Sequence, residues 1–177
     1  MSILPDQSYQ QTLARECGLQ RPAPGWWAWL RDPHAATALL AAVPVWLALA
    51  LWAAPYMRHP SGLPAWASLV FVQPVLEELV FRGILQGQAL RLLAANGKPR
   101  RLGPLTLANV LVTVVFVALH LRAQPLVWAL AVAGPSLVLG HLRERLGSVW
   151  PAVLVHAIYN AGFGLTAWLV VVLHDIT

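Results

Sequence analysis

The chain has 177 residues, of which 58% are apolar and 11% are charged, against roughly 45–50% and 25% in a soluble domain. Its net charge of +5 comes from 12 basic and 7 acidic residues scattered in short groups, so no nucleic-acid partner is expected. The composition predicts a single integral membrane domain with room for about five spanning helices of ~20 residues each.

The N-terminal segment, residues 1–33, is expected to be cytoplasmic or interfacial and to precede a helical domain of residues 34–177. It carries charges and prolines and lacks the basic-then-apolar pattern of a cleaved signal peptide, so we expect it to be retained. Trp26, Trp27 and Trp29 cluster just before the first apolar run. Indole rings often sit at the headgroup level, so this cluster predicts a membrane-surface anchor.

Five apolar runs follow, and each predicts a membrane helix. The second helix is expected to extend from Leu63 to Ala95 and to bend at Pro74, which a membrane helix tolerates when its neighbours satisfy the freed carbonyl. We expect an all-α, polytopic membrane bundle of five to six transmembrane helices. The uncharged stretches, some of them interrupted, cover residues 33–57, 59–102, 102–121, 123–142 and 146–173.

Basic residues between the apolar runs indicate the orientation in the membrane. The segments before, between and after the five helices contain 3, 1, 4, 1, 2 and 0 Lys and Arg residues. Cytoplasmic loops carry the excess of basic residues. The alternation therefore predicts a multi-pass protein with a cytoplasmic N-terminus and an outward C-terminus.

The stretch QPVLEELVFRGILQG places Glu77, Glu78 and Arg82 inside the second predicted helix. A charge at the centre of a spanning helix costs at least ~2.5–3.5 kcal/mol, so such residues are usually paired and functional. Glu78 and Arg82 are spaced to share a helix face and to form an ion pair. Glu77 lies about 100° away without such a local partner. Desolvation would favour its protonated form, which makes Glu77 the candidate general base.

Polar side chains recur in the third and fifth predicted helices. FVALH places His120 one helical turn after Phe116, and HAIYN places His156 and Asn160 on one face of the fifth helix. A lone histidine at a helix end is more often a satisfied interfacial residue. Hydrogen bonds between helices are the structural alternative for His156 and Asn160. Catalysis remains the hypothesis that unites the polar groups of three helices.

These motifs resemble those of a known family. EELVFR fits the Glu-Glu-x-x-x-Arg motif, FVALH the Phe-x-x-x-His motif and HAIYN the His-x-x-x-Asn motif of the CPBP intramembrane proteases, which include the type II CAAX prenyl endopeptidases. Three motifs in this order, each within an apolar run, make the match specific. The chain is shorter than the eukaryotic prenyl endopeptidases, so it is similar to a compact prokaryotic member of the family.

The resemblance implies roles for the motif residues. Glu77 and His120 would activate a water molecule, and His156 and Asn160 would donate hydrogen bonds to the oxyanion that forms when water attacks the scissile carbonyl. The charged pair of the first motif would fix the helix and the charge around Glu77. The resemblance also implies an intramembrane endopeptidase in a prokaryotic cell membrane. Its substrate would be a membrane-associated protein, with prenylated tails or C-terminal sorting tails as candidate cleavage regions.

Other functions stay open on the residues alone. Two histidines and a glutamate could ligate zinc, but the spacing is not that of a His-Glu-x-x-His helix, and Asn160 is a poor zinc ligand. We therefore favour a metal-free mechanism and expect no cofactor. The same ionisable groups could relay protons or bind a solute in a small transporter. A structural polar clamp between helices and a catalytically inactive membrane adaptor are further alternatives.

Overall fold

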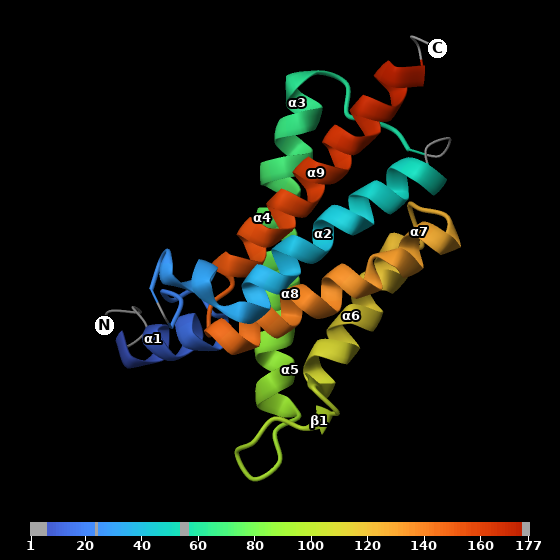
Figure 1. Ribbon diagram of the computed structural model, residues 1–177. Coiled ribbons are helices and arrows are strands. Elements are labelled where there is room, and N and C mark those ends of the chain that lie inside the picture. Colours follow the sequence, from blue (N-terminus) through green and yellow to red (C-terminus); the bar gives the residue numbers. More distant parts are fainter. Residues whose placement is uncertain (1–6, 24, 54–56, 175–177) are drawn as a thin grey trace, which may run out of the picture. The chain divides into compact units, whose positions relative to one another are not determined.

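A computed structural model describes residues 7–23, 25–53 and 57–174 (Figure 1). Within this part of the chain almost every element is helical. The exceptions are the two short antiparallel strands β1, Arg101–Leu102, and β2, Leu105–Thr106. The predicted all-α fold is confirmed.

Six longer helical segments account for most of the described chain, and a short 3₁₀ helix, η1 (Ala28–Arg31), precedes the second of them. Most of them match the predicted runs, although α1 was not predicted. In chain order they are α1 (Gln7–Glu16), α2 (Pro33–Trp52), the run of α3 (Gly62–Ala67), η3 (Ser68–Val72), α4 (Gln73–Glu78), η4 (Leu79–Leu85) and α5 (Gln86–Leu92), then α6 (Leu107–His120), α7 (Leu126–Ala131) with α8 (Ala133–Leu146), and α9 (Trp150–His174).

Three described segments are long and apolar enough to cross a membrane, namely Pro33–Trp52, Leu126–Leu146 and Trp150–Leu173. They correspond to the first, fourth and fifth predicted helices. The third, α6, is apolar but has 14 residues, fewer than the ~20 that a perpendicular span needs. Three spans are sufficient for a multi-pass membrane protein, and the count of five to six stays a prediction.

The helix ends follow from local chemistry. The Asp32 side chain accepts the amide protons of His34 and Ala35 at 3.0 and 3.3 Å, which caps α2. Thr106 caps α6 in the same way by accepting the Asn109 N–H at 3.0 Å. Gly147 ends α8 with φ at 65°, a left-handed conformation that glycine adopts without strain.

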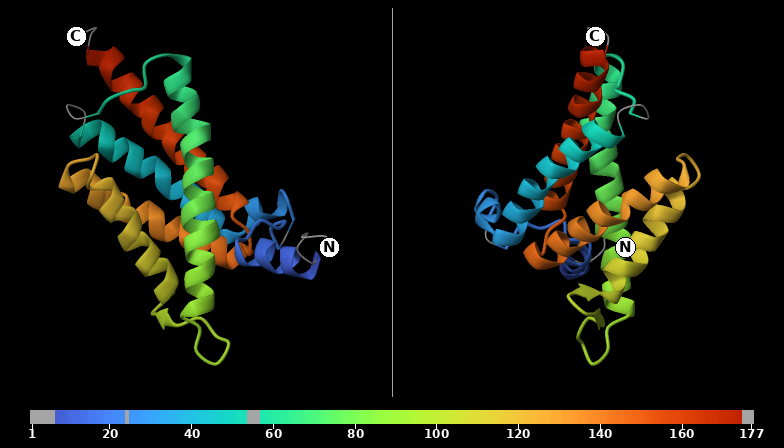
Figure 2. Two further views of the ribbon diagram at one scale, coloured as in Figure 1. Left: turned by 180° about the vertical axis from the view of Figure 1, so that it is seen from behind. Right: turned by 45° about the vertical axis from the view of Figure 1, so that its right-hand side comes forward.

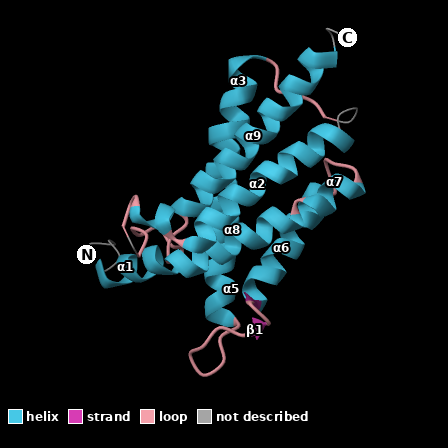
Figure 3. Ribbon diagram, viewed as in Figure 1, coloured by secondary structure: helices cyan, strands magenta, loops and turns pink. Residues whose placement is uncertain are grey.

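The chain divides into two compact units. Unit 1 comprises Met1–Trp29 and Glu77–Ala152, and unit 2 comprises Leu30–Leu76 and Val153–Thr177. In unit 1, α6 packs along α8 and against α5, and α1 contacts α5, as both views in Figure 2 show. Figure 3 shows the strand pair β1 and β2 just before α6.

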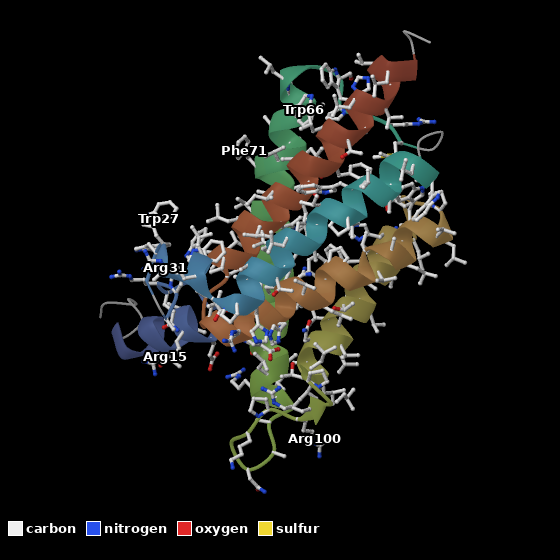
Figure 4. All side chains as sticks on the ribbon, viewed as in Figure 1. Arg15, Trp27, Arg31, Trp66, Phe71 and Arg100 are labelled. Atoms are coloured by element: carbon white, nitrogen blue, oxygen red, sulfur yellow. The ribbon has the colours of Figure 1, made fainter. Side chains whose placement is uncertain are left out.

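Glycine allows close packing of α9 within unit 2. A Cβ atom at Gly162 would overlap the Trp46 ring of α2, and one at Gly164 would lie 2.9 Å from the Trp66 ring of α3. Small residues let the backbones of membrane helices approach closely. Because lipid supplies no hydrophobic force between the helices, this close packing helps to hold them together. In contrast, Phe71 on η3 is 66% exposed and is available to lipid (Figure 4).

The N-terminal segment is more than a surface anchor. Its helix α1 and the residues after it pack within unit 1, where the Val149 N–H donates to the Gly18 carbonyl at 2.8 Å. Trp27 is 75% exposed and stays a candidate anchor, whereas Trp29 is 2% exposed. The anchor interpretation is therefore wrong for Trp29, which is buried.

Candidate active site

The first motif lies where an α-helix widens into a π-helix. Glu77 and Glu78 end α4, and Arg82 lies in the π-helical segment η4. The Arg82 Nε atom is 3.2 Å from the Glu78 Oε2 atom, and both side chains are almost completely buried. The predicted ion pair is therefore confirmed. π-Helical turns inside α-helices are rare and occur frequently at functional sites.

Arg82 also contacts α6 and α8. Its Nη2 atom donates to the Ser136 carbonyl at 3.2 Å and to the Ser136 hydroxyl at 3.0 Å, and that hydroxyl is 2.8 Å from the Thr113 hydroxyl. The guanidinium carbon lies 4.8 Å from the centre of the Phe116 ring, within cation–π range. A buried charge needs such partners. Arg82 thus joins three helices of unit 1.

Further buried polar contacts continue along the same three helices. Gln86, one turn after Arg82, donates to the Gly140 carbonyl at 3.1 Å and to the Glu144 carboxylate at 2.6 Å. Thr106 donates to the same Glu144 oxygen at 2.6 Å. These contacts were not predicted, although the four-residue spacing of Glu78, Arg82 and Gln86 indicates one polar helix face. Glu78 and Arg82 therefore belong to a buried polar network that also includes Ser136 of α8.

Glu77 is half-buried and differs from its neighbour. The expectation that it lacks a local partner is wrong, because the charges of both Glu77 and Glu78 interact with Arg82. Arg82 follows Glu77 by five residues. Glu77 is thus the more accessible of the two adjacent carboxylates, and Glu78 forms the ion pair with Arg82.

His120 has a defined tautomer. Its Nδ1 atom lies 2.8 Å from the Phe116 carbonyl oxygen. A carbonyl can only accept, so Nδ1 carries the proton and the lone pair of the neutral ring is on Nε2. The centre of the His120 ring also lies 4.3 Å from the centre of the Phe116 ring, with the two planes tilted by 43°. Phe116 is the ring that contacts Arg82. Phe116 thus orients the histidine and links it to the first motif.

The third motif lies on α9 in unit 2. His156 is buried, and the Asn160 Nδ2 atom donates to the Leu69 carbonyl of η3 at 2.9 Å. The neighbouring Tyr159 hydroxyl donates to the Ala38 carbonyl of α2 at 2.9 Å. Asn160 and Tyr159 therefore tie α9 to two other helices of its unit.

Pro74 explains why the Leu69 carbonyl accepts a side-chain donor. In η3 the Gln73 N–H donates to the Ser68 carbonyl, five residues back. The same π-helical pattern would pair the next residue, Pro74, with Leu69, but proline has no N–H. The orphaned carbonyl receives the Asn160 amide instead. A π-helical turn thus precedes Pro74, and a donor from α9 replaces the hydrogen bond that proline cannot make, while the bend at Pro74 stays a prediction.

Within the described ranges, no group of three or more His, Cys, Asp or Glu side chains could hold a metal ion. The candidate residues are divided between the units, with Glu77, Glu78, Arg82 and His120 in unit 1 and His156 and Asn160 in unit 2.

A family model described as type II CAAX prenyl endopeptidase Rce1-like matches residues 59–162. This range contains all three motifs and all six candidate site residues. No curated protein and no solved structure matches the chain.

Proposed function

Since the chain belongs to the Rce1-like type II CAAX prenyl endopeptidase family, we propose that it is an intramembrane endopeptidase that hydrolyses a peptide bond with a water molecule activated by Glu77 and His120. Membership of this family implies a protease in a multi-pass membrane protein, and hence a protein substrate. The proposal adds the site and its chemistry. The observation that carries it is the presence of the three motifs within the matched range.

Glu77 and His120 would share the work on the water molecule. Glu77 is the half-buried carboxylate of the motif, so water can reach it more readily than the buried Glu78. The Nδ1 hydrogen bond to Phe116 leaves the His120 Nε2 lone pair to hold or accept a proton. A positioned acid–base group typically contributes a factor of about 10²–10⁴ to the rate. Arg82 and Glu78 would act as positioning residues that keep the charge around Glu77 constant.

His156 and Asn160 would stabilise the oxyanion. The Asn160 amide has two N–H bonds, and the Leu69 carbonyl takes one of them. The second is then held in a fixed direction, as a preorganised donor must be. Such a donor stabilises the transition state by ~3–4 kcal/mol in comparable hydrolases. The mechanism requires the Glu77 and His120 pair and the His156 and Asn160 pair to act on the same peptide bond.

We further propose that the substrate is a membrane-associated protein cleaved in or near the membrane, with its C-terminal tail as the candidate region. The Lys and Arg distribution supports a cytoplasmic N-terminus, and the family resemblance supports a prokaryotic cell membrane. The N-terminal segment, residues 1–33, would lie on the cytoplasmic side, and residues 34–177 would form the protease domain.

Adjacent glutamates provide a matched test. Glu77→Gln keeps size and hydrogen bonding but removes the base, so cleavage should fall by at least about 10²-fold with little loss of folded protein. Glu78→Gln should retain part of the activity and lower the yield of folded protein, because it breaks the buried pair with Arg82. The measurement compares the C-termini of membrane proteins in cells that express either variant or the unmodified chain.

His59 serves as the control for His120. Both rings bond a nearby carbonyl through Nδ1, but His59 lies outside the three motifs. His120→Ala should abolish cleavage, and His59→Ala should leave it unchanged. Full cleavage by Glu77→Gln or His120→Ala would contradict the proposed mechanism. Solute or proton transport without any cleavage would favour the transporter alternative.

A further inference from the structure

An open pocket of about 360 Å³ lies in unit 1, lined by residues of α1, α5, the loop that follows α5 and α8, none of which belongs to the three motifs. Its charged lining comes from three elements: Arg15 of α1, Arg91 of α5 and Arg143 of α8, with Glu16 as the single carboxylate. We call it the arginine pocket. Three guanidinium groups against one carboxylate leave a net positive charge, which predicts an anionic ligand.

The three arginines differ in burial and in their contacts. Arg143 is 7% exposed and is held at the base of the pocket, because its Nε atom donates to the Arg82 carbonyl at 3.0 Å and its Nη2 atom donates to the Glu16 carbonyl. Arg15 and Arg91 are exposed at the rim. Each guanidinium has five N–H donors, more than these contacts use. A fixed base and two adjustable rim residues suit a ligand that enters from solvent or from the membrane surface.

The Glu16 carboxylate neutralises part of the positive charge of the arginine pocket. Its Oε2 atom is 4.0 Å from the Arg91 Nε atom and has no hydrogen bond. A pair at that distance is weak and leaves Arg91 able to turn to a stronger acceptor. Arg91 also donates to the Gln88 side chain at 2.7 Å.

The position of the pocket indicates where the ligand comes from. The loop after α5 carries Lys98, Arg100 and Arg101, the most basic of the segments between predicted helices, which places it on the cytoplasmic side. Leu90 lines the pocket, and the neighbouring Leu92 is 73% exposed. Basic pockets beside apolar side chains at the cytoplasmic surface bind the headgroups of anionic lipids. We propose that the arginine pocket binds the phosphate group of an anionic phospholipid.

Bound lipid would stabilise the fold around the first motif. Arg143 joins the pocket to the backbone of Arg82, and Arg82 pairs with Glu78. A Cβ atom at Gly87 would overlap the Glu16 carbonyl, so the pocket wall depends on close contact between α1 and α5. A phosphate that bridges Arg15 and Arg91 would hold α1 and α5 together.

The test uses the purified full chain in a neutral detergent, with melting temperature as the readout. Short-chain phosphatidylglycerol should raise the melting temperature saturably, while phosphatidylcholine at the same concentration should not. Arg15→Gln and Arg91→Gln should each weaken the apparent affinity about fivefold, the effect of about one charge at a membrane surface. Glu16→Gln should strengthen it, because it removes the competing carboxylate.

Arg100→Gln is the matched control. Arg100 lies beside β1, at some distance from Arg15 (Figure 4), and does not line the pocket. Its substitution should change the affinity less than twofold if the pocket, rather than diffuse positive charge, binds the lipid. An equal loss with Arg100→Gln and Arg15→Gln would overturn the proposal, and so would an absence of stabilisation by phosphatidylglycerol.

A separate titration with inorganic phosphate distinguishes the two sources of the ligand. Stabilisation by phosphatidylglycerol alone supports the lipid. Equal stabilisation by millimolar inorganic phosphate, lost in Arg15→Gln and Arg91→Gln, would overturn the lipid and assign the pocket to free phosphate. Both Arg15 and Arg91 are exposed, so without ligand the variants should have the same melting temperature as the unmodified chain. No proteolysis is measured, so the result is independent of the proposed activity.

Discussion

The hydrogen bond between Asn160 and Leu69 should depend on Pro74. Asn160→Ala removes the donor that replaces the missing proline N–H, so the Leu69 carbonyl loses this hydrogen bond in a bilayer that offers no water. Pro74→Ala restores an N–H five residues after Leu69, within reach of that carbonyl in a π-helical turn. In the Pro74→Ala background, Asn160→Ala should therefore lower the free energy of unfolding much less.

The magnitude follows from the single bond. An unsatisfied buried carbonyl costs about 1–3 kcal/mol, and hydrogen bonds between membrane helices average about 0.6 kcal/mol with a maximum near 1.7 kcal/mol. We expect Asn160→Ala to lower the free energy of unfolding by about 1–1.5 kcal/mol in the natural chain. The two substitutions should be coupled by about 1 kcal/mol in a double-mutant cycle.

Tyr159→Phe is the control for this cycle. It removes one hydrogen bond of the same length from the same helix, but its acceptor is the Ala38 carbonyl, which Pro74 does not affect. Tyr159→Phe should lower the free energy of unfolding by the same amount with proline or alanine at position 74.

The assay is reversible unfolding in mixed micelles by detergent titration, which measures the free energy of unfolding without reference to catalysis. Additivity of Asn160→Ala and Pro74→Ala within about 0.3 kcal/mol would refute the assignment of Asn160 to the orphaned carbonyl. Equal coupling of Tyr159→Phe to Pro74→Ala would refute it as well.

Three other predictions concern catalysis, packing and metal. His156→Ala should lower kcat by about 10²–10³ with KM nearly unchanged, because an oxyanion donor acts in the transition state; a change confined to KM would contradict that role. Gly87→Ala should destabilise the purified chain by about 1–3 kcal/mol, as measured by thermal unfolding, since its Cβ would overlap the Glu16 carbonyl. Gly134→Ala is the control: no atom lies within 4 Å of its added Cβ, so it should be neutral or stabilising. Dialysis against a chelator should leave cleavage and melting temperature unchanged, and elemental analysis should find well under one zinc per chain. If cleavage is lost at an unchanged melting temperature and is restored by zinc, the protein is instead a zinc enzyme.

The sequence predicted the helices because apolar runs of membrane length have few alternatives to a helix. The predicted run from Leu63 to Ala95 corresponds to the observed elements from Gly62 to Leu92. Helix α1 escaped prediction because its residues, Gln7–Glu16, are polar and show no apolar run. The π-helical turns also escaped it, since nothing in the residue pattern distinguishes a residue paired five back from one paired four back.

Part of the candidate site could be predicted in the same way. The Glu78 and Arg82 pair follows from helical spacing, so one sequence was enough to find it. The contacts of Gln86, Ser136 and Glu144 could be recognised only when η4, α5 and α8 were placed side by side, because their partners lie on other elements. Glycines are a second case: the contacts that require Gly87 and Gly140 involve backbone and side chains distant in sequence.

The central claim is that Glu77 activates a water molecule for peptide-bond hydrolysis, and incorporation of oxygen-18 tests it most directly. Membrane proteins from cells lacking this chain are incubated in H₂¹⁸O with the purified unmodified chain or with Glu77→Gln, and new C-termini are identified by mass spectrometry. Each bond hydrolysed by water gains one labelled oxygen in its new carboxyl group. The account predicts a set of labelled C-termini with the unmodified chain that is absent with Glu77→Gln. The same labelled set from both proteins, or no new C-termini from either, would contradict it.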